Sequence, residues 1–454
     1  MFIIIVGQGK VGATLATQLS EEGHELVLVD TDENELSALQ ETLDVATLCG
    51  NGAAADVLME AGVTRSNLLI ACTDSDEVNL LSCMIARKLG AKHTIARVRN
   101  PEYEHNLRLL KEDLQLSMAI NPELTAAREI FRILKFPTFL KRETFFRERA
   151  ELVEMRVSDG SALVGLKMMD FPKATKAKAL ICCVERKGVV HIPHGSFVLE
   201  AGDRLSIVSN ASGLLQFCKD LNLSTSSVKS VMIVGGSRTS VHLAKLLLKN
   251  HVKVTLIEQD LEKCRQLTEE LPDATMVHGN GTKQDVLLSE GIRDTDAVLA
   301  LTGFDEENLI ISMFASFVGI RKTVTKINRA EYLDVYNTAG IDTIISPKLL
   351  TANAIIRYVR AMGSTAGNSM TALVRTMDEK AEAIEFRVPE NGHYINKPFK
   401  DLKILPNALV AAISRANEII IPSGSDMLKT GDSVVIIATR DAAVLNLNQV
   451  FQQQ

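Results

Sequence analysis

The chain repeats itself with a period of about 229 residues. Ile4-Ile5-Val6-Gly7 recurs as Met232-Ile233-Val234-Gly235, and Gly50-Asn51-Gly52 recurs as Gly279-Asn280-Gly281. Further matches follow in the same order: Leu28-Val29-Asp30 with Leu256-Ile257-Glu258, Ile192-Pro193-His194-Gly195 with Ile421-Pro422-Ser423-Gly424, and Gly202-Asp203 with Gly431-Asp432. A repeat this long indicates two copies of a domain pair, because the units of a solenoid are several-fold shorter.

Each copy contains two kinds of hydrophobic pattern. Short β-branched runs at residues 3–6, 26–29, 68–71 and 95–98 alternate with helical stretches, which is typical of a βαβ series with a parallel sheet. From about residue 150 the pattern changes to short strands separated by Gly, Pro and Asp turns, with one helix around residues 210–221. We therefore predict an α/β fold as a tandem duplication: two Rossmann-like parallel-sheet domains, at residues 1–135 and 230–362, each followed by a small mixed α+β domain, at residues 148–222 and 372–454.

The last helix of each parallel-sheet domain has a start signal. In Asn121-Pro122-Glu123, Asn is suited to cap the helix, Pro takes the first helical position and Glu faces the positive end of the helix dipole. Ser346-Pro347 is expected to do the same in the second copy.

A glycine-rich loop follows the first predicted strand. It reads Gly7-Gln8-Gly9-Lys10-Val11-Gly12 and opens a helix, which is the context in which Gly-x-Gly-x-x-Gly indicates a dinucleotide site. Gly7 permits the tight turn, Gly9 lets a pyrophosphate approach the main chain, and Gly12 lets the helix lie close to the strand. The N–H groups of the first helical turn, where Lys10 and Val11 lie, then face the anion.

An acidic residue ends the second predicted strand. Asp30 follows Gly12 at the spacing at which a carboxylate accepts hydrogen bonds from both hydroxyls of an adenosine ribose. The same carboxylate would repel a 2′-phosphate. The first copy is therefore predicted to bind NAD(H) or ATP/ADP in preference to NADP.

The second copy departs from this motif. Gly235-Gly236-Ser237-Arg238-Thr239-Ser240 keeps the first glycine and has serine at the other two positions. Ser237 places a side chain where phosphates should approach, at a cost on the order of 1–3 kcal/mol. Glu258 still occupies the ribose position, and Arg238 matches Lys10 as a cation that could meet a phosphate or remain a solvated surface charge. We expect this copy to bind a nucleotide more weakly or differently, or to be empty.

Further polar residues are predicted at the carboxyl edge of each parallel sheet, where ligands of such folds bind. Individually each is suited to capping a loop or forming a salt bridge, and together they would make a site. They are Asn51 and Asn280 after the third strand, Thr73, Asp74 and Thr302 after the fourth, and Arg97 and Lys326 at the fifth.

Composition narrows the function classes. The formal net charge is −6 and no block of five or more basic residues occurs, which argues against a nucleic-acid partner. Seven cysteines without a Cys-x-x-Cys pair are typical of reduced core residues in a cytosolic protein, and no metal site is predicted. No apolar run is long enough to cross a membrane, and no signal peptide is expected.

Four phenylalanines lie close together in the sequence, at Phe136, Phe139, Phe145 and Phe146. This clustering favours packing within or between the small domains over a subunit interface.

Taken in order, these motifs resemble the TrkA family of Trk potassium-uptake regulatory proteins, with two RCK N-lobes and two RCK C-lobes in one chain. The resemblance rests on the glycine loop, the acidic strand end, Gly-Asn-Gly, Ala96-Arg97-Val98-Arg99-Asn100-Pro101-Glu102-Tyr103, Ile-Pro-x-Gly and Gly-Asp, nearly all given twice. It implies a cytoplasmic, non-catalytic regulatory subunit, peripheral at the inner face of the cell membrane. Such a subunit forms a homo-oligomeric gating ring beneath a membrane-embedded potassium channel or transporter and binds NAD(H), with ATP/ADP as further ligands. Gly7, Gly9, Gly12 and Asp30 would be nucleotide contacts, and Gly235 and Glu258 their counterparts.

Two other function classes remain open. A dehydrogenase needs an acid or base poised beside the nicotinamide, and the small domains offer no such group. A tandem Rossmann oxidoreductase is therefore the weaker alternative, beside a stand-alone nucleotide or redox sensor. Whether the ring contains two or four chains is left open by the sequence.

Overall fold

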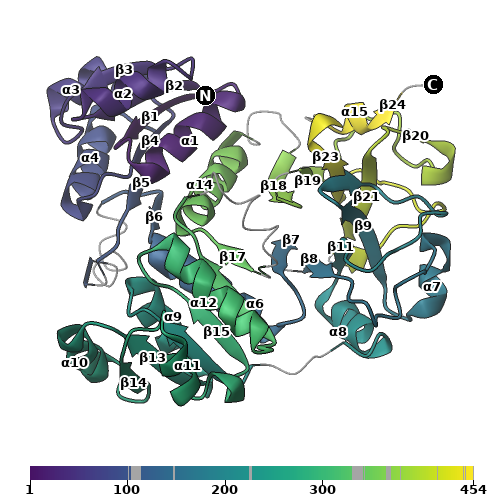
Figure 1. The fold of residues 1–454 in the computed structure, drawn as a ribbon. Helices are drawn as coiled ribbons and strands as arrows, with labels where there is room; N and C mark the ends of the chain where they lie inside the picture. The colour runs from purple at the N-terminus through teal and green to yellow at the C-terminus, as the bar shows by residue number, and fades with distance from the viewer. Residues whose placement is uncertain are drawn as a thin grey trace. The chain divides into compact units, whose positions relative to one another are not determined.

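A computed structural model of the protein describes residues 1–100, 102–103, 114–146, 149–223, 228–329, 341, 343–363, 370–378, 380–416, 418–442, 444 and 446–452 (Figure 1). The predicted domain boundaries at residues 148 and 454, and Pro101 of the motif quoted above, lie outside these residues. Among the described helices, none is both long and apolar enough to cross a membrane.

The first parallel sheet has six strands in the order β3-β2-β1-β4-β5-β6. The strands are β1 (Phe2–Val6), β2 (Glu25–Asp30), β3 (Ala46–Cys49), β4 (Leu68–Ala71), β5 (His93–Arg97) and β6 (Met118–Ile120). The helices are α1 (Lys10–Glu21), α2 (Glu33–Gln40), α3 (Ala55–Glu60), α4 (Asp76–Leu89) and α6 (Pro122–Lys135). The strands expected from the β-branched runs are therefore present, with β5 ending at Arg97, one residue earlier than expected.

The position of β1 explains why the site forms where it does. β1 pairs with β2 on one side and with β4 on the other, and every residue of β1 is buried. Strand order therefore reverses at β1, and the loops after β1 and β4 diverge at the carboxyl edge of the sheet. This is the crevice in which open α/β sheets bind ligands.

The second parallel sheet repeats the first, in the order β14-β13-β12-β15-β16-β17. Its strands are β12 (Ser230–Val234), β13 (Lys253–Glu258), β14 (Thr275–His278), β15 (Ala297–Ala300), β16 (Lys322–Lys326) and β17 (Ile344–Ile345). Its helices are α9 (Arg238–Lys249), α10 (Leu261–Glu270), α11 (Gln284–Ser289), α12 (Asp305–Phe317) and α14 (Pro347–Gly363). The predicted duplication of the Rossmann-like domain is confirmed.

The remaining two large sheets are antiparallel. One has the order β10-β9-β11-β8-β7 and contains β7 (Lys141–Phe145), β8 (Ala150–Arg156), β9 (Ala179–Arg186), β10 (Val189–His191) and β11 (Arg204–Ser209), with helices α7 (Phe171–Ala174) and α8 (Ala211–Asp220). The other has the order β18-β19-β23-β21-β22 and contains β18 (Met370–Thr376), β19 (Ala381–Arg387), β21 (Ala408–Arg415), β22 (Glu418–Ile420) and β23 (Ser433–Thr439). A short pair, β20 (Lys403–Ile404) and β24 (Phe451–Gln452), and helix α15 (Leu447–Val450) complete this domain.

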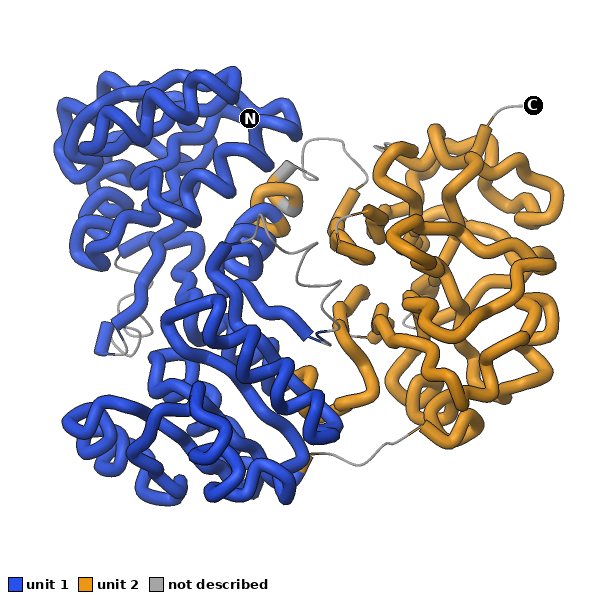
Figure 2. The backbone as a smooth tube through the Cα atoms, viewed as in Figure 1, with its two compact units in different colours: residues 1–131, 229–356 blue, residues 132–228, 357–454 orange. Residues whose placement is uncertain are grey.

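The four domains group by type into two compact units (Figure 2). Unit 1 consists of Met1–Phe131 and Lys229–Ile356 and holds both parallel sheets. Unit 2 consists of Arg132–Val228 and Arg357–Gln454 and holds both antiparallel sheets. Each unit is thus built from the same part of both copies.

The two antiparallel sheets of unit 2 share one apolar core. Phe145 and Phe146 pack there with Leu152 from the first copy and with Val374 and Ile437 from the second. The prediction that the clustered phenylalanines pack within or between the small domains is confirmed for these residues. The core joins the two small domains through their own strands.

Two glutamates link these sheets reciprocally. Glu154 of β8 accepts a hydrogen bond from the Met377 N–H at 3.2 Å, and Glu385 of β19 accepts one from the Phe146 N–H at 3.1 Å. Both N–H donors belong to residues with positive φ, +52° at Met377 and +53° at Phe146. The paired sheets therefore repeat each other's contacts. Among the described residues, only Glu154 of this pair also binds an arginine, because the second copy has Ser433 where the first has Arg204.

Both helices begin at the predicted proline, but the side-chain cap predicted for the second helix is wrong. The Asn121 side chain accepts the Leu124 N–H at 3.0 Å, as expected of a cap, and α6 begins at Pro122. Ser346 precedes α14 in the same way, but its hydroxyl is buried and has no hydrogen-bond partner in the part of the chain that the structure describes.

The burial of the cysteines gives a first testable prediction. Of the seven cysteines, Cys49 is exposed and the others are buried. Burial raises the pKa of the Cys72 thiol to about 12 and that of Cys218 to about 11, so that neither forms a thiolate at pH 8. We expect one thiol per native chain to react rapidly with DTNB, and all seven after unfolding in guanidinium. Rapid reaction that survives the substitution Cys49→Ser would contradict this assignment.

Candidate nucleotide site

The loop between β1 and α1 holds main chain where a side chain would not fit. Gly7 has φ +94°, and a Cβ added to it would lie 2.6 Å from the Thr73 nitrogen. A Cβ on Gly12 would lie 1.9 Å from the Gly7 carbonyl oxygen. Gly9, by contrast, is exposed, caps α1 at φ −59°, and would have nothing within 4 Å of an added Cβ. Gly7 and Gly12 are therefore required by the fold, whereas the space in front of Gly9 is open.

The two residues that begin α1 differ in what they expose. Lys10 is exposed at the first helical position, while the Val11 side chain is buried in the core. A ligand at this helix start could therefore meet the Lys10 ammonium and main-chain N–H groups, with Val11 contributing only its main chain.

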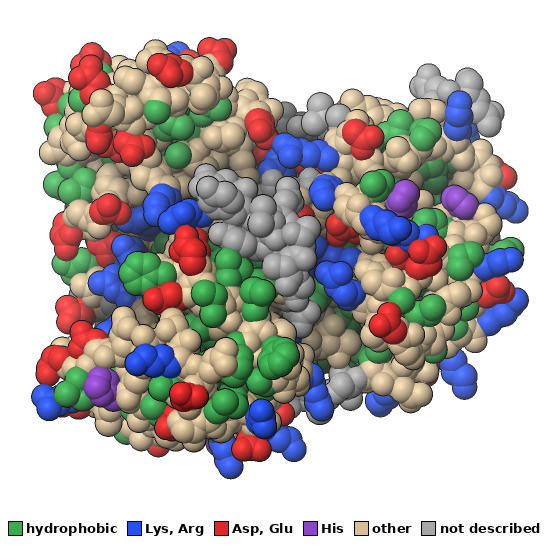
Figure 3. Space-filling model, in the orientation of Figure 1, with side chains coloured by type: hydrophobic (Ala, Val, Ile, Leu, Met, Phe, Trp, Pro, Cys, Tyr) green, Lys and Arg blue, Asp and Glu red, His purple; other side chains and the backbone are tan. Residues whose placement is uncertain are grey.

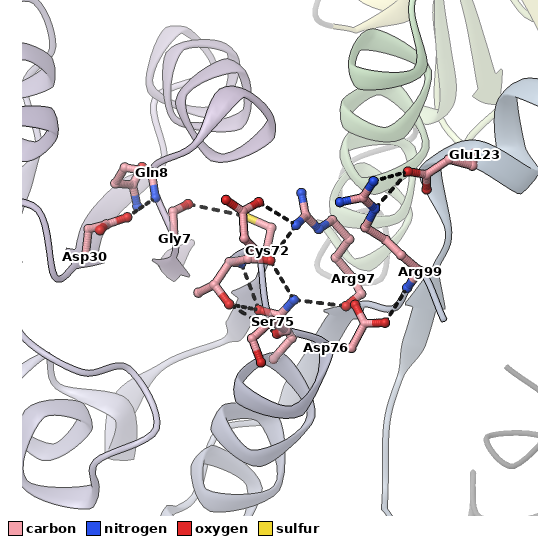
Figure 4. A network of polar contacts seen from close by, with 12 residues as sticks. Gly7, Gln8, Asp30, Cys72, Ser75, Asp76, Arg97, Arg99 and Glu123 are labelled. Atoms are coloured by element: carbon pink, nitrogen blue, oxygen red, sulfur yellow. Dashed lines mark hydrogen bonds and ion pairs between the residues drawn. The ribbon is translucent and has the colours of Figure 1, made fainter. Parts of the chain in front are cut away.

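Asp30 lies beside this loop at the end of β2 (Figure 4). One carboxylate oxygen accepts the Gln8 N–H at 2.5 Å, and the other accepts the Asp32 N–H at 3.0 Å. No Lys or Arg of the described chain forms an ion pair with it. Because a carboxylate offers about four acceptor positions, about two remain for a ligand's hydroxyl groups.

The loops after β4 and β5 are tied together by a buried asparagine. Asn79 of α4 accepts the Thr73 N–H at 2.8 Å and donates to the carbonyl oxygens of Thr73 and Arg97, both at 3.0 Å. The Arg97 guanidinium donates to the Thr73 carbonyl oxygen at 2.6 Å and pairs with Asp74 at 3.0 Å. Asn79 therefore acts as a clamp between the two loops. Together with Arg97 it holds Thr73, Asp74 and Arg97, three of the predicted site residues, at one edge of the sheet.

The charge and the hydrogen-bond donors of Arg97 are only partly satisfied by protein groups. Its residue surface is 8% exposed and its Nε has no hydrogen-bond partner among the described residues, while the side chain of its partner Asp74 is fully exposed. A buried guanidinium with a free donor at this edge is suited to a negatively charged ligand. Asn51 is exposed after β3 and accepts the Ala53 N–H at 2.9 Å, so in the structure it caps its own loop.

In the second copy the serine side chains are used by the helix. Gly235 has φ +97° and makes the same tight turn as Gly7. Ser237 caps α9 by accepting the Ser240 N–H at 3.3 Å, and the Ser240 hydroxyl donates to the Gly235 carbonyl oxygen at 2.5 Å. Arg238 is exposed at the first position of α9, as Lys10 is in α1. The loop therefore keeps its course although it lacks two of the glycines.

Glu258, the acid of the second copy, receives more hydrogen bonds from the protein than Asp30 does. Glu258 accepts the N–H groups of Gly236, Gln259 and Asp260 at 2.8, 2.8 and 3.1 Å, and its Oε2 lies 3.0 Å from Lys263 Nζ. Burial alone would raise the pKa of Glu258, but the main-chain donors and Lys263 outweigh burial and the pKa is lowered. A cavity of about 130 Å³ lies in front of this acid, lined also by Ser237, Asn280 and Thr302.

Asn308 ties the loops of the second sheet together as Asn79 does in the first, but the second copy lacks the carboxylate of Asp74. Asn308 accepts the Thr302 N–H at 2.8 Å and donates to the Lys326 carbonyl oxygen at 2.9 Å. Gly303 stands where the first copy has Asp74, and Lys326 Nζ donates to the Leu301 carbonyl oxygen at 3.3 Å. Burial lowers the pKa of Lys326, against the opposing effect of Asp305 and Glu123. Asn280 accepts both the N–H and the hydroxyl of Thr282.

Three structural features of these sites were missed by reading the sequence. Asn79 and Asn308, which hold these loops, are not among the predicted site residues. Gln8 is buried with its side-chain oxygen unpartnered, and nothing in the sequence pattern marks it. The pairing of Lys263 with Glu258 has a signal, because the corresponding residue of the first copy is the oppositely charged Glu35.

Comparison with known proteins gives the same organisation. The TrkA-N domain model matches residues 3–122 and 231–347, and the TrkA-C domain model matches residues 152–222 and 383–447. The Trk system potassium uptake protein TrkA homolog of Archaeoglobus fulgidus is 32% identical over 453 residues, covering 100% of both chains. The Trk system potassium uptake protein TrkA of Halomonas elongata is 30% identical over 455 residues, covering 100% of this chain and 99% of its own.

Solved structures share the fold. The GsuK channel superimposes with a TM-score of 0.64 at 20% identity, covering 99% of this chain and 77% of that one. The GsuK channel bound to NAD gives a TM-score of 0.62, covering 97% and 77%. The family models and the full-length relatives show that this chain belongs to the TrkA family.

Proposed function

We propose that the chain is the regulatory subunit of a Trk-type potassium uptake system and senses NAD(H) at the site of the first copy. ATP and ADP are further ligands of the same chemistry, since they share the adenosine ribose and a phosphate chain. The second copy provides a related site with weaker or different binding. Occupancy is transmitted as a shift between arrangements of the domains, and the protein carries out no chemical step.

The observation that carries this proposal is the state of Asp30. It lies at the strand end beside an open, glycine-lined helix start, has about two acceptor positions left, and has no cationic partner among the described residues. Ribose hydroxyls are suited to those positions, and a phosphate is suited to the N–H groups and to Lys10. The relatives support the ligand class, because one solved GsuK channel has NAD bound and another GsuK structure has ADP bound.

A regulatory role accounts for the polar groups at the site better than catalysis does. Thr73 and Thr302 are bonded to the clamp asparagines, and Arg97 is bonded to a loop carbonyl and to Asp74. These groups hold loops in place and do not form an acid–base pair beside a substrate. The ligand's binding energy is then available to shift the protein between conformations: a tenfold difference in affinity between two arrangements corresponds to about 1.4 kcal/mol.

We propose a membrane-embedded potassium channel or transporter subunit as the partner, with the chain in the cytoplasm at the inner face of the cell membrane. The names of the Trk system relatives and of the GsuK channel support such a partner, on which a homo-oligomeric ring of these chains would act. A nucleic-acid partner is not part of the proposal. The net charge is −6, and on the face shown in Figure 3 the blue and red side chains are interspersed.

The substitution Asp30→Ala tests the proposal. Loss of charge-assisted hydrogen bonds to the ribose should weaken NADH binding about tenfold. Calorimetric titration of the full chain with NADH, NAD and ATP, in wild type, Asp30→Ala and Glu258→Ala, would measure this and rank the two sites. Asp44→Ala, which removes an exposed aspartate of the same domain, is the matched control and should bind as wild type does.

Other outcomes would reject the proposal. Equal affinities of wild type and Asp30→Ala for all three nucleotides would show that the ribose is bound elsewhere. Steady oxidation of NADH with a panel of keto acids would favour an oxidoreductase. Failure to co-purify with any multi-span potassium protein would favour a stand-alone sensor.

A further inference from the structure

The two copies carry opposite charges at the same helical position next to the ribose acid. In each copy an aspartate two residues after the acid caps the following helix: Asp32 accepts the Asn34 N–H, and Asp260 accepts the Glu262 and Lys263 N–H groups. Counted from these caps, the third helical residue is Glu35 in α2 and Lys263 in α10. The copies therefore differ by a full charge reversal at this point.

A lysine in the first turn of a helix is electrostatically unfavourable, because the amino-terminal end of the helix is positive. The first copy follows the usual preference with Glu33 and Glu35. In the second copy Lys263 instead extends back to the acid, where its Nζ lies 3.0 Å from Glu258 Oε2. Its Cε lies 3.4 Å from the position of a Cβ added at Gly236, so that the side chain passes close to the glycine loop.

The consequence is a difference in free acceptor positions. A carboxylate offers about four such positions. Glu258 receives three main-chain N–H groups and Lys263, which fill them, whereas Asp30 receives only the N–H groups of Gln8 and Asp32. A ribose hydroxyl can therefore bond to Asp30 directly, but it can bond to Glu258 only by displacing the Lys263 ammonium.

We infer that Lys263 is a specificity-determining residue that competes with the ribose hydroxyls of a nucleotide for Glu258. The second site is therefore indifferent to the ribose hydroxyls, and the first site recognises them. This inference rests on the proposed nucleotide-binding function and assigns the difference between the two sites to one side chain. Lys263 lines the cavity in front of Glu258 and is partly exposed, so that it can be displaced without unfolding the helix.

The test compares ATP with 2′,3′-dideoxy-ATP, which lacks both ribose hydroxyls. The full chain carries Gly9→Val and Asp30→Ala to disable the first site. Calorimetry then gives, for the second site, the dissociation constant of 2′,3′-dideoxy-ATP divided by that of ATP. With Lys263 present the ratio should be near one. Lys263→Met keeps the aliphatic stem and removes the ammonium, and it should raise the ratio about fivefold, the equivalent of a partly exposed ion pair. The ratio cancels any direct effect of the lost charge on the phosphates.

Lys245→Met is the matched control, because Lys245 forms an exposed pair with Glu270 at 2.6 Å in the same domain and does not line the cavity. Its ratio should stay near one. Equal ratios in the Lys263 and Lys245 variants, or no binding of ATP at the second site in either, would overturn the inference. If the unmodified chain binds no nucleotide at all, the proposed function itself fails, which distinguishes the two conclusions.

Discussion

Replacing Gly9 with valine is expected to weaken NADH binding to the first copy by about a hundred-fold while leaving the fold intact. A Cβ at this position meets nothing within 4 Å, and the backbone at φ −59° is open to any residue. The valine side chain would stand where a pyrophosphate must approach the start of α1, at a cost of up to about 3 kcal/mol. The only structural cost is a poorer helix cap, about 1 kcal/mol or less.

This substitution separates binding from folding in a way that its neighbours do not. A side chain on Gly7 or Gly12 would collide with main-chain atoms of the protein itself, at 2.6 Å and 1.9 Å. Calorimetry gives the affinity of Gly9→Val, and thermal unfolding gives its stability. Gly160→Val, at another glycine with nothing within 4 Å, is the control and should bind as wild type does. If Gly9→Val bound NADH with unchanged affinity, the phosphates of the ligand would not bind at this loop.

The sequence was informative wherever local pattern decides structure. The β-branched runs, the glycine loop and the acidic strand ends each follow from residue type and spacing, and the repeat supplied every element twice. Helix capping was less predictable, because it depends on the orientation of the side chain as well as on the residue type. Asn121 and Ser346 both precede a proline, yet only the Asn121 side chain accepts an N–H of the helix in the described residues.

Side-chain pairing at the site could not be obtained in the same way. Arg97 and Asp74 were both predicted at the sheet edge, but their pairing depends on how the Asn79 clamp sets the loop between them. Lys263 is not marked by the residues that the two copies share. The difference in ribose recognition inferred here comes from what they do not share, the exchange of Glu35 for Lys263.

The substitution Glu154→Gln should destabilise unit 2 by about 3 kcal/mol, because it removes the buried carboxylate between Arg204 and the other sheet, although Arg204 keeps its ion pairs with Asp378 and Glu185. Glu154 is 1% exposed and binds Arg204 through two nitrogens, at 2.5 and 2.9 Å. Thr376 and Met377 of the other sheet bond to its second oxygen. For a unit of this size the midpoint of thermal unfolding should fall by roughly 10 °C. Glu385→Gln is the matched control and should cost about 1 kcal/mol, since Glu385 accepts the Phe146 N–H and its copy has Ser433 in place of Arg204.

Acid titration gives this prediction a second signature. Burial alone would raise the pKa of Glu154, but Arg204, Lys141 and the hydrogen bonds from Thr376 and Met377 together outweigh burial and lower the pKa from 4.5 to about 2. Because the folded-state pKa lies below the unfolded value, the stability that Glu154 contributes is fully present above about pH 5 and is lost as the pH falls towards 2. Between pH 7 and pH 3 the difference in unfolding free energy between wild type and Glu154→Gln should shrink by roughly 2 kcal/mol. A difference independent of pH, or equal losses in Glu154→Gln and Glu385→Gln, would show that the link between the two sheets does not depend on the Glu154–Arg204 pair.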